Sequence, residues 1–233
     1  GEIDYEGFME MTTSASPSVG HCNTMGTALS MNALAEALGM SLPTCASIPA
    51  PYRERGQMAY TTGKRICQMV IDGLKPSKIM TKKSFENAIA VASALGASSN
   101  CPPHLIAIAR HMGIELTLND WQRVGENVPL IVNCMPAGKY LGEGFHRAGG
   151  VPAVMYELQK AGVLHEDCAS VSGKTMGEIA QQSQTSNADV IFSYENPLKH
   201  GAGFIVLSGN FFDSAIMKMS VVGEAFRKTY LSN

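Results

Sequence analysis

The spacing of apolar positions predicts helices along most of the first two thirds of the chain. Between residues 24 and 38, Met25, Ala28 and Leu29 begin a helical repeat that runs on to Ala35 and Glu36, and Gly39 follows as a stop. Further helices are expected over residues 52–72, 82–95, 102–112 and 151–161, with a short one near Trp121.

Residues with known preferences for helix ends refine these boundaries. Thr81 is expected to cap the helix over 82–95, and Gly96 to end it. Pro102-Pro103 suits a first helical turn, where the missing N–H costs nothing. Asn119 or Asp120 is expected to cap the short helix near Trp121.

Short apolar runs predict buried strands at residues 129–134, 190–193 and 203–207. Helices that alternate with such runs favour an α/β fold, in the form of a three-layer α/β/α sandwich. The Ser/Thr-rich stretch 12–18 is predicted to be a loop. After Asn187 the composition changes, and the tail is predicted to be β structure whose sheet is left incomplete. Gly1 and this tail suggest a piece of a longer protein.

Composition narrows the function classes. Of the 233 residues 45% are hydrophobic and only 16% are charged, against about 25% in typical domains. So little charge predicts surfaces covered by other domains or subunits, and hence a homodimer or homotetramer. The net charge of −2 gives no reason to expect nucleic acid or an anionic membrane as a partner.

The cysteines do not form a disulfide scaffold or a CxxC metal site. Six are scattered at wide intervals: Cys22, Cys45, Cys67, Cys101, Cys134 and Cys168. Reduced thiols in a cytoplasmic protein are the expectation. The sequence shows no signal peptide and no apolar run of the roughly 18 residues that a membrane span needs.

Cys22 is the chemically informative cysteine, because it lies at a predicted loop-to-helix junction. Free backbone N–H groups at such a junction favour a thiolate, which suits a nucleophile or an iron ligand. The alternative is a buried small residue, as most free cysteines are. The neighbouring His21 does not make a dyad by adjacency alone.

Other motifs give weaker indications of a functional site. Gly173-Lys174-Thr175 resembles the end of a phosphate loop, but Cys168 stands where its first glycine is required, so this interpretation is rejected. Gly149-Gly150 could bind an anion or permit tight packing, and packing is favoured. The remaining histidines have no metal-site spacing and are expected to be structural or solvated: His104, His111, His146, His165 and His200.

A series of motifs in order along the chain resembles the dihydroxy-acid and sugar-acid dehydratases. The match begins with Gly20-His-Cys-Asn-Thr-Met-Gly-Thr-Ala28. It continues through Ile48-Pro-Ala-Pro-Tyr-Arg-Glu-Arg55, Gly96-Ala-Ser-Ser-Asn100, Pro136-Ala-Gly-Lys-Tyr-Leu-Gly-Glu143 and Phe145-His-Arg-Ala-Gly-Gly-Val-Pro-Ala153. The residues after Cys22 resemble the aldonic-acid branch more than the branched-chain amino-acid branch.

The resemblance implies an enzyme, a hydro-lyase that dehydrates a sugar acid or another 2,3-dihydroxy acid to a 2-keto-3-deoxy acid. It implies an iron–sulfur cluster, [2Fe-2S] or [4Fe-4S], with Cys22 as the one cluster ligand that can be carried over, and Mg²⁺. The general base, the Mg²⁺ ligands and the other cluster cysteines are expected outside this chain. Sugar acid is the expected small-molecule partner.

The resemblance also implies a domain organisation. Residues 1–188 are expected to be part of an N-terminal α/β domain, and residues 189–233 to begin a C-terminal β-barrel-like domain. A second hypothesis is a non-catalytic remnant or interaction module of the same family.

Overall fold

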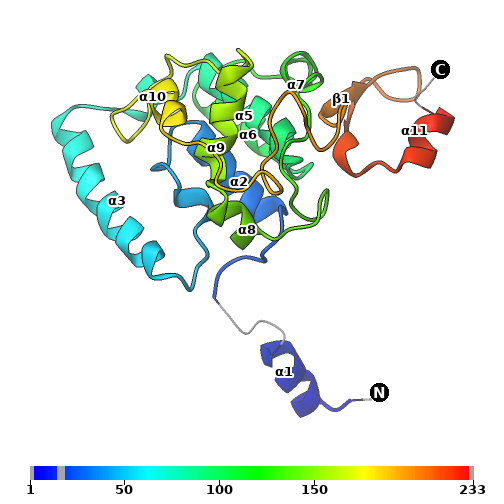
Figure 1. Cartoon of the computed structure of the whole chain (residues 1–233), viewed down its shortest axis with the longest axis horizontal. Coiled ribbons are helices and arrows are strands. Elements are labelled where there is room, and N and C mark those ends of the chain that lie inside the picture. Colours follow the sequence, from blue (N-terminus) through cyan, green and yellow to red (C-terminus); the bar gives the residue numbers. More distant parts are fainter. Residues whose placement is uncertain (1–2, 15–18, 231–233) are drawn as a thin grey trace.

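The computed structural model describes residues 3–14 and 19–230, and it combines many helices with one small sheet (Figure 1). The predicted mixed α/β class is confirmed. The helices are α1 (Tyr5–Ser14), α2 (Thr27–Ala37), α3 (Arg53–Ile71), α4 (Pro76–Ile79), α5 (Lys82–Leu95), α6 (Cys101–His111), α7 (Leu118–Gly125), α8 (Gly142–Arg147), α9 (Gly150–Lys160), α10 (Met176–Gln181) and α11 (Glu224–Tyr230). Strand β1 (Phe204–Leu207) pairs antiparallel with β2 (Ala215–Lys218).

Helix α5 is the centre of the core, and it packs against α2, α6, α7 and α9. All of its residues from Ser84 onward except Glu86 are buried. Alanines at positions 88, 90, 92 and 94 let the neighbouring helices approach closely, because an alanine side chain is a single methyl group. Other elements therefore surround α5 on every side, as expected for a helix that is apolar around its whole circumference.

The predicted residues at both ends of α5 are confirmed. Thr81 caps α5 by accepting a hydrogen bond from the Ser84 N–H, and Gly96 ends it in the left-handed region at φ 58°. The predicted cap of the short helix was wrong. Thr117 caps α7, and Asp120 is its capping-box partner three positions into the helix, accepting from the Thr117 N–H at 2.9 Å.

Two of the three predicted strands are only isolated bridges. In the run 129–134, Leu130 bridges Lys199 and Val132 bridges Ile191. The amides of Ile131 and Val132 both donate to the Ala94 carbonyl at the end of α5, so a helix end takes the bonds that a neighbouring strand would. The third run does form β1.

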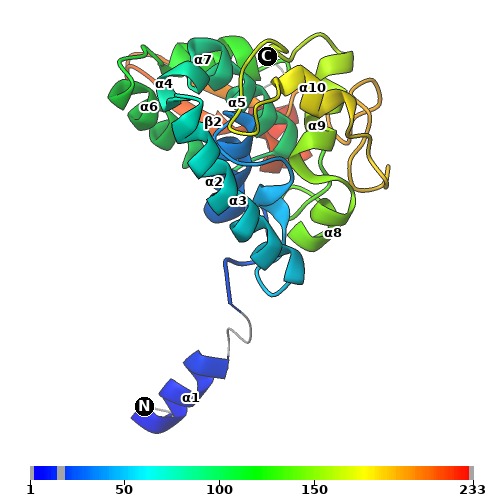
Figure 2. The same ribbon diagram turned by 90° about the vertical axis from the view of Figure 1, so that its left-hand side faces the viewer.

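The predicted loop 12–18 is partly wrong, because the backbone of residues 12–14 continues α1. Its remaining residues, 15–18, lie outside the described part of the chain. Figures 1 and 2 show α1 projecting from the body, and Figure 1 shows α3 running along the body's outer edge.

The tail from residue 189 begins on the body. Val190, Ile191 and Phe204 belong to the main core cluster, and the Phe204 ring meets the buried Trp121 ring edge-on with 5.1 Å between centroids. Beyond β2 the described part of the tail, up to residue 230, forms helix α11 and no further strand. The domain boundary at 188/189, the three-layer order and the barrel remain predictions. Of the described helices, none has both the length and the apolar character to cross a membrane.

Candidate functional site

Cys22 lies in the loop that leads into α2, four residues before the Gly26 cap, as the sequence predicts. Its thiol is exposed, which excludes the alternative of a buried small residue. The Thr24 hydroxyl lies 3.4 Å from the Cys22 sulfur. Hydrogen bonding from the Thr24 side chain, and then from its backbone N–H, lowers the pKa of the thiol. The site therefore stabilises the thiolate relative to an ordinary cysteine, and the thiolate is the form that binds metals and attacks electrophiles.

His21 does not act on this sulfur in the structure. Its Nδ1 lies 2.7 Å from the Cys22 carbonyl oxygen, which fixes the ring against the backbone. Nδ1 donates to that carbonyl, since a carbonyl oxygen only accepts. Cys22 and His21 are therefore neighbours without forming a nucleophile–base pair.

The Cys22 loop is clamped to a segment more than 100 residues away. Asn23 accepts a hydrogen bond from the Glu143 N–H through its side chain at 2.9 Å, and another from the Gly142 N–H through its carbonyl at 2.8 Å. The Met25 N–H donates to the Met135 carbonyl at 2.7 Å. A Cβ added at Gly142 would lie 2.9 Å from the Asn23 side-chain oxygen, so this close approach requires glycine.

The start of α2 is tied in the same way to residues 96–100. The Asn100 amide donates to the Thr27 hydroxyl at 2.8 Å, and that hydroxyl lies 3.0 Å from the Ser98 hydroxyl. The Ser98 N–H donates to the Ser30 hydroxyl at 3.0 Å. Motif blocks that are separate in sequence therefore converge around one loop and one helix end.

A cavity of about 420 Å³ opens beside this loop. Its wall combines hydrogen-bonding side chains with a proline-containing turn: His21, Asn23, Asn32, Pro49, Tyr52, Arg55 and Glu143 among others. Donors and acceptors both face this space, which is the arrangement that binds polar small molecules.

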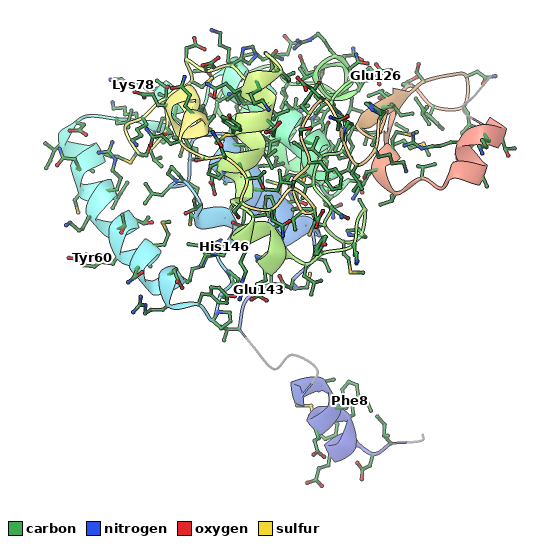
Figure 3. The ribbon with its side chains drawn as sticks, in the orientation of Figure 1. Phe8, Tyr60, Lys78, Glu126, Glu143 and His146 are labelled. Atoms are coloured by element: carbon green, nitrogen blue, oxygen red, sulfur yellow. The ribbon has the colours of Figure 1, made fainter. Side chains whose placement is uncertain are left out.

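Tyr52, Glu143 and Arg147 form a polar cluster at the edge of the cavity. The Tyr52 hydroxyl donates to the Glu143 carboxylate, and Arg147 donates to Glu143 at 2.8 Å and to the Tyr52 oxygen at 3.0 Å. The bond from Tyr52, with the positive charge of Arg147, lowers the pKa of Glu143. Figure 3 shows Glu143 and His146 on α8, on the side of the body nearest α1.

His146 extends this cluster toward the body. Its ring packs edge-on against Tyr52, and its Nδ1 lies 3.3 Å from the Ser47 hydroxyl. Burial is the largest influence on His146 and lowers the pKa of its imidazole. The ring is therefore neutral at pH 7, and it serves here as a structural contact between α8 and the turn before α3.

A buried carboxylate, which the sequence analysis missed, supports the cavity wall. Glu36 on α2 is 2% exposed, and its oxygens accept hydrogen bonds from the backbone N–H groups of Thr44 at 2.6 Å and Ala46 at 2.8 Å. Thr44 is held at φ 71°, a region that threonine rarely adopts. The signal available in the sequence was an acidic residue inside an otherwise apolar helical repeat.

The described residues do not complete a metal site. No three His, Cys, Asp or Glu side chains among them gather as ligands. Burial raises the pKa of Cys101 to about 12 and of Cys134 to about 11, and it also raises the pKa of Cys168. Cys22 suits one thiolate ligand, and an open cluster needs about three.

The Gly149-Gly150 pair serves close packing, as predicted, and Gly173-Lys174-Thr175 leads into the cap of α10. A Cβ at Gly149 would lie 2.8 Å from the Ala153 Cβ, and one at Gly150 would lie 2.6 Å from the Ser47 hydroxyl, so this pair serves close packing. Thr175 caps α10 by accepting from the Glu178 N–H, and the Lys174 ammonium donates to Gln182 at 2.9 Å.

Comparison with known proteins identifies a family that matches this chain. The model described as "Dihydroxy-acid/6-phosphogluconate dehydratase N-terminal" matches residues 1–179. A D-xylonate dehydratase of Caulobacter vibrioides is 60% identical over 232 residues, which is 100% of this chain and 39% of the relative. An L-arabinonate dehydratase of Rhizobium leguminosarum bv. trifolii is 49% identical over 210 residues, 90% of this chain and 36% of the relative.

A more distant relative gives the same picture. A dihydroxy-acid dehydratase of Caldanaerobacter subterraneus subsp. tengcongensis is 41% identical over 223 residues, 95% of this chain and 40% of its own length. The chain thus spans about 40% of the curated relatives that it matches.

Proposed function

Because the chain belongs to the dihydroxy-acid/6-phosphogluconate dehydratase family, we propose that it is a portion of a hydro-lyase that dehydrates a sugar acid. The observation that carries this proposal is the exposed, thiolate-favouring Cys22 in a loop clamped by Asn23. The names of the relatives favour an aldonic acid such as a pentonate over a branched-chain dihydroxy acid.

The proposed reaction removes water from a 2,3-dihydroxy acid. The C2 proton and the C3 hydroxyl leave, and the resulting enol tautomerises to a 2-keto-3-deoxy acid. An iron–sulfur cluster and Mg²⁺, when bound, would supply Lewis-acid chemistry at the leaving hydroxyl and the acid oxygens. The described residues do not by themselves hold the cluster or Mg²⁺. Of these residues, Cys22 would supply one thiolate ligand to the cluster.

The remaining residues of the site hold the Cys22 loop and the cavity wall in place and would bind the substrate. Asn23 fixes the Cys22 loop against Gly142 and Glu143, while Glu36 fixes the turn that carries the opposite wall. The cavity between them offers both donors and acceptors, which suits a polyhydroxylated ligand. The Arg55 guanidinium at its wall suits a carboxylate.

Replacement of Cys22 tests the proposal. In the complete gene product, Cys22→Ser should remove the brown iron–sulfur absorbance and abolish keto-acid formation from aldonic acids. Cys67→Ser is the matched control, because Cys67 is the other exposed cysteine among the described residues, and it should retain both colour and activity. A Cys22→Ser protein that keeps its cluster and its turnover would refute the assignment.

The second hypothesis, a non-catalytic member of the family, makes a different prediction. The unchanged gene product would then hold no iron after anaerobic reconstitution and would not turn over any aldonic acid. Under the favoured hypothesis only the isolated 233-residue chain is inactive, because it supplies one of about three cluster thiolates. Assays of the whole gene product and of this chain side by side distinguish the two.

A further inference from the structure

The guanidinium of Arg55 is oriented by one short turn of the chain. Arg55 lies in the first turn of α3, is half-buried, and lines the cavity beside Cys22. Its Nη2 donates to the Ile48 carbonyl, and its Nη1 donates to the Cys45 sulfur at 3.5 Å. Both acceptors belong to residues 44–48, named here the 44–48 turn, which contains the 3₁₀ helix η1 (Cys45–Ser47). Because a guanidinium is planar and rigid, two contacts to the same turn set its orientation.

Arg55 keeps hydrogen-bond donors for a ligand. A guanidinium has five N–H donors, and the two contacts to the 44–48 turn use two of them. Within the described part of the chain, no carboxylate lies within ion-pair distance of Arg55. Its positive charge is therefore available to a ligand at the cavity wall.

Glu36 holds the 44–48 turn from the side of α2. Its carboxylate accepts hydrogen bonds from the Thr44 N–H at 2.6 Å and the Ala46 N–H at 2.8 Å, on either side of Cys45. Thr44 has φ 71°, a conformation that threonine rarely adopts and that persists only where surrounding contacts hold it. Glu36 is 2% exposed and is not among the residues that line the cavity, so its influence on a ligand there passes through the turn.

The two charged side chains at the cavity would orient an acid. Of the described residues that line it, Arg55 is the one permanent cation and Glu143 the one carboxylate. Glu143 is ionised at pH 7, because its pKa is lowered, so it accepts hydrogen bonds and repels another carboxylate. Arg55 only donates, and its fork matches the two oxygens of a carboxylate. An acid in this cavity would therefore direct its carboxylate to Arg55 and its hydroxyls to Glu143.

We propose that Arg55 binds the carboxylate of the acid substrate, and that Glu36 is the positioning residue that sets the Arg55 guanidinium through the 44–48 turn. This inference rests on the proposed dehydratase function and adds to it how the cavity orients the substrate. Glu36 does not touch the substrate, but it determines where the Ile48 carbonyl and the Cys45 sulfur lie. Every link from Glu36 to Arg55 is a direct contact between the turn and one of these two side chains.

Steady-state kinetics of the complete gene product, with a pentonate as substrate, test the role of Arg55. Arg55→Met keeps the apolar stem and removes the charge. It should raise KM by about tenfold or more with a smaller change in kcat, because the lost contact binds the substrate and the transition state alike. Arg53→Met is the matched control, since Arg53 is exposed in the same helical turn and does not line the cavity, and it should leave KM unchanged. Both variants should keep the brown iron–sulfur absorbance.

A double-mutant cycle separates positioning from a general structural effect of Glu36. The amide introduced by Glu36→Gln sets an NH₂ group against one of the two N–H donors, so the turn shifts and KM should rise. If Glu36 acts through Arg55, adding Glu36→Gln to Arg55→Met should raise KM by no more than about twofold further, because no guanidinium is left to misplace. Two independent effects would multiply. Trp121 fluorescence checks folding, and Glu36→Asp, which shortens the carboxylate by one methylene, takes the same place in the cycle if Glu36→Gln does not fold.

The outcomes distinguish this inference from the proposed function. Turnover in the parent protein, together with a KM that Arg55→Met leaves unchanged, overturns the inference and leaves the proposed function intact. Effects of the Glu36 and Arg55 variants that multiply overturn the positioning role of Glu36. A parent protein that turns over no aldonic acid refutes the proposed function, and this inference with it.

Discussion

Replacing Glu36 by glutamine should remove a specific pH dependence from the stability of this protein. Burial is the main cause that raises the pKa of Glu36 from 4.5 to about 7, although the Thr44 and Ala46 N–H groups oppose it. The folded protein therefore keeps this proton at pH values where the unfolded chain has released it. Linkage then makes stability fall as pH rises between 4.5 and 7, and adds no slope outside that window.

The magnitude follows from the two pKa values. A rise from 4.5 to about 7 corresponds to about 3 kcal/mol of stability lost across the window. The amide introduced by Glu36→Gln does not titrate, and its NH₂ group faces one of the two N–H donors, at a cost of about 1–3 kcal/mol at every pH. The free-energy gap between the two proteins should therefore change by about 3 kcal/mol between pH 4.5 and 8, in favour of Glu36→Gln as pH rises.

Urea unfolding measures this gap. The chain has a single tryptophan, and Trp121 is fully buried against Phe204, so its fluorescence reports loss of the core. Glu195→Gln is the matched control, since Glu195 is an exposed carboxylate, and its curve should run parallel to that of the parent protein. If the Glu36→Gln curve also runs parallel, within about 0.5 kcal/mol, then Glu36 does not titrate in this window and the reasoning fails.

Two further predictions concern the attachment of the tail and the reactivity of the thiols. Gly203→Ala should lower Tm by roughly 5–15 °C in thermal unfolding, because the new Cβ would overlap the Gly125 carbonyl oxygen, whereas Gly209→Ala, which meets no described atom within 4 Å, should leave Tm nearly unchanged. Equal Tm values for the two variants would contradict this contact. Iodoacetamide at pH 7 should label Cys22, whose thiol is exposed and has a lowered pKa, and should leave Cys101 unlabelled, because burial raises the pKa of that thiol to about 12. Peptide mapping that finds Cys101 labelled first would count against the described burial.

Sequence alone determined the features that depend on a few neighbouring residues. Thr81 and Gly96 marked both ends of α5, because capping involves side chains and amides only three or four positions apart. Cys22 was placed before a helix for the same local reason, and the order of the motifs identified the family. The cap of α7 was misplaced by two or three residues, although Thr117 and Asp120 have the spacing of a capping box.

Tertiary structure decided which of these segments meet. The amino-acid order does not show that Asn23 binds the backbone of Glu143, or that Glu36 turns its carboxylate to the amides of residues 44–46. The run 129–134 has the composition of a strand, yet the carbonyl at the end of α5 takes two of its amides. Such pairings depend on which groups packing leaves close together and out of water, and a buried amide bonds the nearest acceptor whatever its distance along the chain.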